Sequence, residues 1–226
     1  MIEEKLISLK RELIEYVTLT ENMIDKAIKG LLEKEKSFLI EVIENDEPRT
    51  DQYEVELDEK CVRLIAQFQP KAIDLRTILM ILEMNKDIER IGDLSANMSH
   101  SGLFLIERPQ VKPLIDIPRM ASIVQTMLKD SVNAFIENDS DLAREAFHRD
   151  KLVNDLRDQI LRELITFMSS DPTRIERSFH LISLAIDLER IGDLSTNICE
   201  DVVYMVEGEM IKHKNEPENQ NPKKNN

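Results

Sequence analysis

The segment Glu89-Arg-Ile-Gly-Asp-Leu-Ser decides the fold, because the same seven residues return from Glu189. Between the ten-residue windows 88–97 and 188–197, eight positions are identical at an offset of 100 residues. Helical composition does not produce such a match by accident, so internal duplication is the simplest explanation. The sequence therefore predicts two copies of one structural unit.

Apolar residues around both copies have the spacing of a buried helix face. Met84, Ile88, Ile91, Leu94 and Met98 recur as Leu184, Leu188, Ile191, Leu194 and Ile198. Steps of three and four residues are typical of one helix side packed in a core. Glycines number 5, prolines 8, and charged residues make up 33% of the chain, which favours long helices with exposed faces. We predict an all-α protein of two tandem three-helix bundles related by internal duplication.

The same periodicity predicts where the helices and domains lie. We expect helices at 3–29, 31–69 and 71–100, with Pro48 interrupting the second, and then helices ending near residue 137, at 141–168 and at 172–212. The prolines at 109, 113 and 118 predict a linker. The expected domains are a first bundle at 1–108, a linker at 109–118, a second bundle at 119–213 and a disordered polar tail at 214–226.

Charge and hydropathy exclude several classes of function. The net charge of −14 and the pI near 4.8 argue against nucleic-acid binding, which needs clustered Lys and Arg. No apolar stretch has the length of a membrane span, and the N-terminus lacks the pattern of a signal peptide. We expect a cytoplasmic protein without direct membrane insertion. Cys61 and Cys199 are isolated, as expected of reduced thiols.

The repeated segment also contains the candidate functional residues. At about 100° per residue, Glu89, Asp93 and Asn97 form a row opposite the apolar stripe, and Glu189, Asp193 and Asn197 repeat it. Two acids four residues apart repel, so the helix gains nothing from the pair, whereas a metal ion can bind both carboxylates. One such pair would indicate a solvated acidic face. Two identical copies favour a metal site.

A facing helix would have to supply further ligands. Glu47-x-x-x-Asp51 in the first unit corresponds within one residue to Asp150-x-x-x-Asn154 in the second. Asn154 replaces an acid, which predicts weaker binding in the second unit, because charge count largely sets affinity for hard cations. Pro48 makes the geometry of the Glu47 pair uncertain. A second acidic row in the first unit, Glu54 and Asp58, has no counterpart.

An enzyme or metal store of the di-iron carboxylate type is the alternative hypothesis. Such bundles use Glu-x-x-His on two helices. Here Glu145-x-x-His148 occurs without a copy in the first unit. No Ser/His/Asp or Cys/His arrangement and no phosphate-binding glycine loop can be drawn from the chain, so we predict no catalytic residues and no enzyme activity.

Four stretches together resemble the PhoU family of phosphate-signalling regulators over nearly the whole chain. They are the duplicated Glu-Arg-Ile-Gly-Asp motif, Gln-Pro-Lys-Ala-Ile-Asp-Leu-Arg at 69–76, Val-Glu-Leu-Asp-Glu-Lys-Cys at 55–61, and the run Asn-Ile-Cys-Glu-Asp-Val-Val-Tyr that begins at Asn197. The resemblance implies paired three-helix bundles in a cytoplasmic, often dimeric protein.

The resemblance also implies partners and a cofactor. Family members are negative regulators of the phosphate-starvation response that act between the phosphate ABC transporter and the phosphate-sensing histidine kinase. Their Glu/Asp-x-x-x-Asp motifs bind iron, zinc or similar metals, and this pattern falls on Glu89 with Asp93 and on Glu189 with Asp193, and less clearly on the Glu47 and Asp150 pairs. Oxygen ligands accept Fe, Zn, Mn and Mg alike, so the metal stays open.

Overall fold

A computed structural model describes residues 2–71 and 73–208, and these residues form helices without any strand. The first half contains α1 (Ile2–Glu33), α2 (Lys36–Glu41), the π-helical turn η1 (Val42–Asp46), α3 (Glu47–Phe68) and α4 (Ile73–Ile106). The second half contains α5 (Asp116–Glu137), α6 (Ser140–Phe147), α7 (Asp150–Ser170), the short 3₁₀ turn η2 (Pro172–Arg174) and α8 (Ile175–Glu207).

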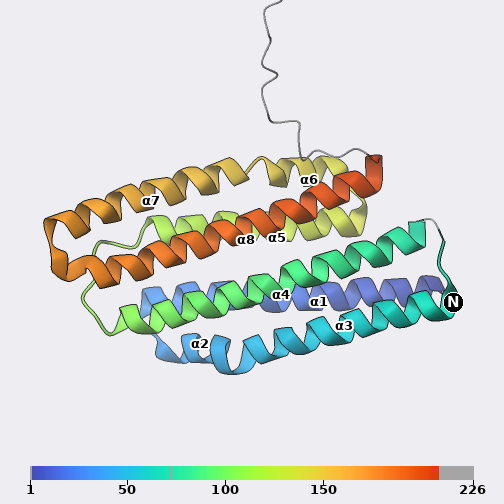
Figure 1. The fold of residues 1–226 in the computed structure, drawn as a ribbon, viewed down its shortest axis with the longest axis horizontal. Helices are drawn as coiled ribbons and strands as arrows, with labels where there is room; N and C mark the ends of the chain where they lie inside the picture. Colours follow the sequence, from blue (N-terminus) through green and yellow to red (C-terminus); the bar gives the residue numbers. More distant parts are fainter. Residues whose placement is uncertain (1, 72, 209–226) are drawn as a thin grey trace, which may run out of the picture.

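The two halves form two elongated bundles that lie side by side (Figure 1). In each bundle three long helices pack together, with the short helix and its turn filling one end. The bundles meet mainly along α4 and α8, and also through α1 and α5. This arrangement confirms the predicted all-α fold of two bundles. It also places the repeated segment on the two helices that join the halves.

The burial pattern fixes which residues of the two units are equivalent. Buried residues of α1 and α5 match at an offset of 104, so that Leu13, Tyr16 and Met23 correspond to Ile117, Met120 and Met127. Those of α3 and α7 match at an offset of 103, which pairs Thr50 with Val153. The repeated motif gives an offset of 100 for α4 and α8. The units can therefore be compared side chain by side chain.

Each unit breaks its middle helix at the same place. In the first unit the π-helical turn η1 precedes Pro48, which stands in the first turn of α3. Proline has no N–H and its ring clashes with the carbonyl four residues earlier, so the preceding turn widens. The predicted interruption at Pro48 is thus confirmed. In the second unit, a turn at residues 148–149 separates α6 from α7, whereas we predicted one helix over 141–168.

An ion pair anchors each break to the first long helix of its unit. Lys26 Nζ on α1 lies 2.6 Å from Oδ2 of Asp46, and the carboxylate of Asp46 is buried. At the equivalent positions, Arg149 donates to Asp130 on α5. The acid and the base have exchanged helices between the two units, while the contact itself has remained. The ion pair fixes the start of α3 and of α7, which matters because both helices contribute to the candidate sites.

Several helix ends differ from the predictions. α1 continues past Gly30 to Glu33, because a single glycine weakens a helix without ending it. A β-carbon at Gly30 would lie 2.7 Å from side-chain atoms of Leu39, so the packing of Leu39 favours glycine there. α5 begins at Asp116, inside the predicted linker 109–118, because proline is tolerated in a first helical turn. α8 ends at Glu207, where Gly208 takes a φ of 75°. The helix predicted to residue 212 thus already ends before Gly208. Residues 209–212 and the predicted tail at 214–226 lie outside the described residues.

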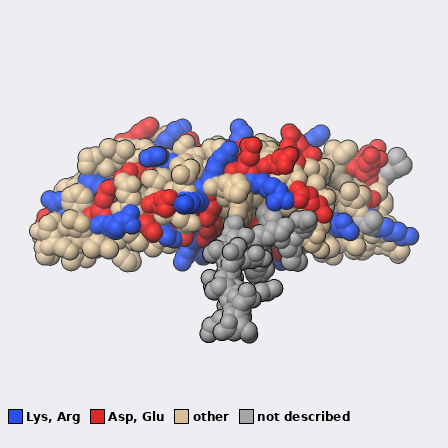
Figure 2. Space-filling view, turned by 90° about the horizontal axis from the view of Figure 1, so that it is seen from above, with Lys and Arg blue, Asp and Glu red and all other residues tan. Residues whose placement is uncertain are grey.

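The other predictions concern the surface and the core. None of the described helices combines the length and the apolarity that a membrane crossing requires. The face above α6 and α7 carries Lys and Arg interspersed with Asp and Glu (Figure 2), so the net acidity of the chain does not produce a purely negative surface there. Cys61 and Cys199 are buried and free. The domain boundaries drawn at 108 and 119 stay a prediction.

Candidate cation sites

The glycines of the repeated motif bring the site-bearing helices together. A β-carbon at Gly92 would lie 3.0 Å from Oγ1 and 3.2 Å from Cβ of Thr50, so α4 approaches α3 closely at this point. Gly192 faces Val153 of α7, and the same construction gives a looser 3.4 Å. The close approach of α3 therefore explains Gly92, whereas the space around Gly192 would admit a β-carbon. Residues that flank them on α4 and α8 come near the side chains of α3 and α7.

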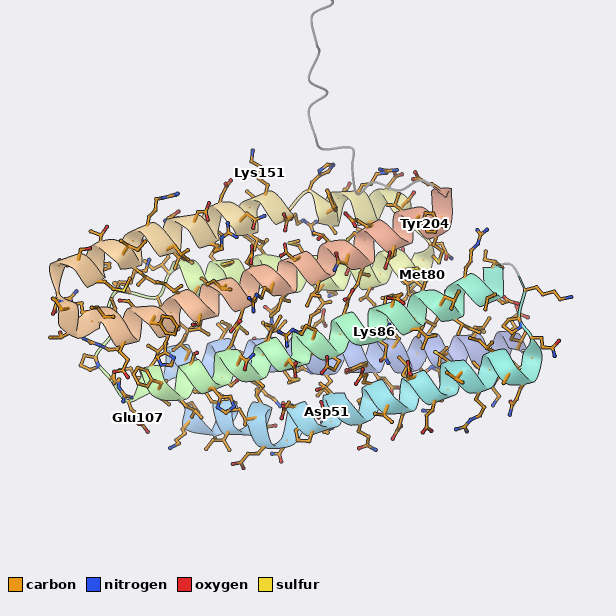
Figure 3. All side chains as sticks on the ribbon, viewed as in Figure 1. Asp51, Met80, Lys86, Glu107, Lys151 and Tyr204 are labelled. Atoms are coloured by element: carbon orange, nitrogen blue, oxygen red, sulfur yellow. The ribbon has the colours of Figure 1, made fainter. Side chains whose placement is uncertain are left out.

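Four carboxylates gather where α3 crosses Gly92. They come from Asp51 and Glu54 on α3 and from Glu89 and Asp93 on α4, and we call them the first cluster. Burial raises the pKa of Glu89, and repulsion from the other three raises it further. Arg90 pairs with Asp93 at 2.9 Å on the exposed side. Figure 3 labels Asp51 near the start of α3, where that helix runs beside α4. The first cluster holds excess negative charge.

A buried tyrosine lies on α1, which packs against α3 and α4, the two helices that carry the first cluster. Tyr16 of α1 is 0% exposed, and its hydroxyl has no hydrogen-bond partner. Its ring stacks on Tyr53 of α3 at 5.2 Å between centroids, which fixes its direction. Burial raises the pKa of Tyr16 first, and the four carboxylates of the first cluster raise it further. The hydroxyl therefore stays protonated and can donate a hydrogen bond.

Asn85 adds a second polar side chain to the same region. It is almost fully buried on α4, one turn before Glu89. Its Nδ2 donates to the Glu54 carbonyl at 2.9 Å, while its Oδ1 is buried without a partner. A buried polar atom without a partner normally costs about 1–3 kcal/mol. The first cluster thus lies against two such atoms, one donor and one acceptor.

The second unit supplies its own cation. Arg157 of α7 forms ion pairs with Glu189 of α8 and with Asp158. Asp150 Oδ2 accepts a hydrogen bond from Asn154 Nδ2 at 2.7 Å, while Asp150 Oδ1 is buried without a partner. We call Asp150, Asn154, Glu189 and Asp193 the second cluster. A guanidinium already neutralises part of it.

The carboxylates of the second cluster still repel one another. Burial raises the pKa of Asp150, and Glu189 raises it further, against the opposing effects of Arg157 and Asn154. Although Asp193 is exposed, lost hydration raises its pKa to about 6, with added repulsion from Glu189 and Asp150. The second cluster therefore retains some attraction for a cation, reduced by Arg157.

Equivalent positions explain why the two clusters differ. By the offsets established above, Glu54 corresponds to Arg157 and Asn85 to Ala185. Likewise Tyr16 corresponds to Met120, which is also buried. The first unit thus has an acid where the second has a base. Its two buried polar residues are replaced in the second unit by apolar ones.

The predicted site residues are placed as follows. Glu89, Asp93 and Glu189 are half-buried, so the predicted row does not simply face outward; α4 and α8 each contact several helices, which cover much of their circumference. Of the first row Asn97 is exposed, and Asn197 is half-buried. Glu47 begins α3 and is half-buried. Glu47 is not among the charges that raise the pKa of Tyr16 or of Glu89. Asn97 carries no charge.

The ligand chemistry of the first cluster fits a hard cation. Its four carboxylates supply oxygen ligands, which Mg²⁺, Mn²⁺ and Ca²⁺ accept. Within residues 2–71 and 73–208, no three His, Cys, Asp or Glu side chains lie close enough to hold one ion between them. A hydrated ion, whose waters bridge to carboxylates, spans wider gaps than a bare one. The second cluster fits less well because Arg157 is present.

Sequence reasoning missed Tyr16 and Arg157. The signal for Arg157 was available, since extending the Glu47–Asp150 correspondence by seven residues places Arg157 opposite Glu54. Tyr16 had no comparable signal, because its position in an apolar stripe is that of a core residue. The alternative hypothesis rests on Glu145 and His148, and both side chains are exposed. Glu145 lies near the end of α6, and His148 follows that helix.

The fold and these clusters define a duplicated helical-bundle protein with paired acidic sites at the packing of its second and third long helices. Residues 13–101 and 117–202 both match the PhoU domain family. The chain belongs to the PhoU family. The two matched segments coincide with the two structural units.

Individual relatives agree with this assignment. The chain is 37% identical over 204 residues to a "Phosphate-specific transport system accessory protein PhoU homolog" of Aquifex aeolicus, covering 90% of this chain and 92% of the relative. A protein of the same description from Pseudomonas aeruginosa is 35% identical, covering 86% of this chain and 81% of the relative.

Solved structures have the same fold. The crystal structure of PhoU from Pseudomonas aeruginosa superposes with a TM-score of 0.88 at 32% identity, over 92% of this chain and all of that one. The structure of the phosphate transport system regulatory protein PhoU from Streptococcus pneumoniae gives 0.85 at 24% identity, over 93% of this chain and 99% of the other, and supports the fold alone.

Proposed function

We propose that the chain regulates phosphate uptake and the phosphate-starvation response as a negative regulator. The observation that carries the proposal is the match of both structural units to one family whose relatives are described as accessory proteins of the phosphate-specific transport system. The chain acts by protein contact and not by turnover. Its partners are the ATPase subunit of the phosphate ABC transporter and the phosphate sensor histidine kinase.

The cation sites belong to the same proposal. The first cluster binds a hydrated divalent or trivalent ion such as Mg, Mn, Fe or Zn, which the carboxylates of Asp51, Glu54, Glu89 and Asp93 attract and contact directly or through its bound waters. Excess negative charge in the first cluster and the buried unpartnered atoms beside it support this assignment. The ion stabilises the packing of α3 on α4. The second cluster binds a cation more weakly.

The assembly and location follow from the family resemblance. We propose a homodimer in the cytoplasm, held at the inner face of the membrane by the transporter. Partner proteins with basic surfaces would complement the net charge of −14.

A complementation experiment tests the regulatory role. In cells from which this gene is deleted, a reporter of the phosphate-starvation response is expected to be active at high phosphate, and the wild-type chain restores repression. A reporter that stays silent at high phosphate in the deletion strain would contradict the proposed role. The purified ATPase subunit and the kinase, each immobilised separately, are expected to retain the chain.

Oxygen consumption separates the adaptor from the alternative hypothesis. The chain is loaded with Fe²⁺ and given a reductant, and oxygen uptake is compared with that of Glu89→Gln/Asp93→Asn. No uptake above the variant is expected. Sustained uptake that the variant lacks would favour a di-iron oxidoreductase over an adaptor.

A further inference from the structure

The hydroxyl of Tyr16 is a buried hydrogen-bond donor without an acceptor, on a tyrosine that is among the largest fully buried side chains. Tyr16 is 0% exposed, so water outside the bundle cannot satisfy it. Phenylalanine would fill the same space without this cost. In the second unit, the equivalent Met120 fills the core without a polar atom. Packing alone therefore does not explain a tyrosine here.

The surroundings of the hydroxyl indicate what it serves. Tyr16 stands on α1, which packs against both α3 and α4, and the charges of all four carboxylates of the first cluster raise its pKa. The stacked ring of Tyr53 holds it against α3. Asn85 supplies a buried acceptor, Oδ1, that also has no partner. A donor and an acceptor are thus both available to water molecules within the site.

We propose that Tyr16 is a positioning residue of the cation site in the first unit, whose hydroxyl donates a hydrogen bond to the water shell or carboxylate ligands of a hydrated cation. The inference rests on the proposed cation site and adds α1 to it. The neutral phenol orients the ligands without adding charge. Hydrogen bonds from outside the ligand shell commonly govern metal affinity in this way.

The substitution Tyr16→Phe tests the role with little change in shape. Titration with Mn²⁺ followed by calorimetry is expected to show affinity in the first unit weakened roughly tenfold, as for other lost hydrogen bonds to metal ligands. Tyr53→Phe is the matched control, because it keeps the stacked pair of rings and leaves the Tyr16 hydroxyl in place. Its affinity is expected to equal that of the wild type.

Thermal unfolding separates this role from a structural one. Without a cation, Tyr16→Phe is expected to melt at or above the wild-type temperature, because it removes a buried unpaired hydroxyl. With saturating Mn²⁺, the wild type is expected to gain more than the variant. A purely structural tyrosine would lower the melting temperature of the variant equally in both conditions.

A luminescent ion locates the site directly. The chain has three tyrosines and no tryptophan, so Tyr53→Phe/Tyr204→Phe leaves Tyr16 as the single sensitiser. Tb³⁺, which takes oxygen ligands, is expected to emit when tyrosine is excited, and Glu89→Gln/Asp93→Asn in that background is expected to abolish the emission. Absence of tyrosine-sensitised emission from an otherwise bound ion would overturn the proposal.

The outcomes distinguish the two claims. If Mn²⁺ binding is lost in Glu89→Gln/Asp93→Asn but unchanged in Tyr16→Phe, the role of Tyr16 is wrong and the cation site stands. If Glu89→Gln/Asp93→Asn leaves Mn²⁺ binding unchanged, the cation site itself is wrong, and the role of Tyr16 falls with it.

Discussion

The two acidic clusters arise from one repeated motif but compensate their charge in different ways. In the first, Glu54 joins three other carboxylates above Tyr16 and Asn85. In the second, Arg157 occupies the position of Glu54 and forms an ion pair with Glu189. Both clusters lie beside a buried oxygen without a partner, but the count of charges favours an external cation in the first cluster. The comparison shows that a duplicated motif can keep its fold while the two copies balance the charge of their carboxylates differently, the second with Arg157.

Removing the acids of one cluster at a time should give the largest difference. Glu89→Gln/Asp93→Asn is expected to weaken Mn²⁺ binding on the order of a hundredfold, because affinity for hard cations follows the number of charged ligands. The matched variant Glu189→Gln/Asp193→Asn should leave the tightest binding event in place. Isothermal titration calorimetry measures both, and equal losses in the two variants would break the comparison.

Exchanging the residue that distinguishes the clusters should convert one into the other. Arg157→Glu is expected to strengthen cation binding in the second unit at least about tenfold, because it removes the internal cation and adds a ligand. Glu54→Arg should weaken the first cluster correspondingly. Electron paramagnetic resonance measures how much Mn²⁺ each variant binds. If Arg157→Glu binds as many Mn²⁺ ions as the wild type, Arg157 does not control the site.

The glycines of the motif offer a comparison in stability. Gly192→Ala is expected to stabilise the fold by about 0.5–1 kcal/mol, because alanine is the better helix former and the new methyl group has ordinary contact with Val153. Gly92→Ala is expected to destabilise it by about 1 kcal/mol, since Thr50 Cβ lies at only 3.2 Å and cannot swing away. Urea unfolding of both variants measures the difference, and opposite signs are the expected result.

The smallest expected effect concerns pH. A carboxylate whose pKa is raised in the folded state favours the fold at low pH and loses that contribution as pH rises through the folded value. For Asp193 this interval runs from the ordinary aspartate pKa of 3.8 to about 6. Its exposure limits the effect to less than about 1 kcal/mol. Asp193→Asn should flatten the stability profile between pH 4 and 6, and an identical profile in the variant would exclude this titration.

Much of the fold could be predicted from the sequence because helical periodicity is a local signal. The repeat at Glu89 and Glu189 fixed the number of units, and Pro48 marked the break before α3. The break at His148 was missed because no proline or glycine marks it; the ion pair of Arg149 with Asp130 joins residues nineteen positions apart in the chain. Such pairing becomes visible only when helices are placed.

The candidate site was predicted only in part for the same reason. Glu89 and Asp93 follow from spacing on one helix, but their approach to Glu54 depends on how α3 packs against α4. The predicted outward row neglected that α4 contacts α1, α3 and α8, which leaves little of its surface free. Tyr16 comes from a third helix, and only its missing hydrogen-bond partner distinguishes it from the core.

Anomalous diffraction from a crystal of this protein soaked in Mn²⁺ would test the central claim most directly. We predict a manganese peak between α3 and α4, close to Tyr16. At the equivalent position between α7 and α8 we expect the guanidinium of Arg157 and no comparable peak. Peaks of equal height in both units, or a peak in the second unit alone, would contradict it.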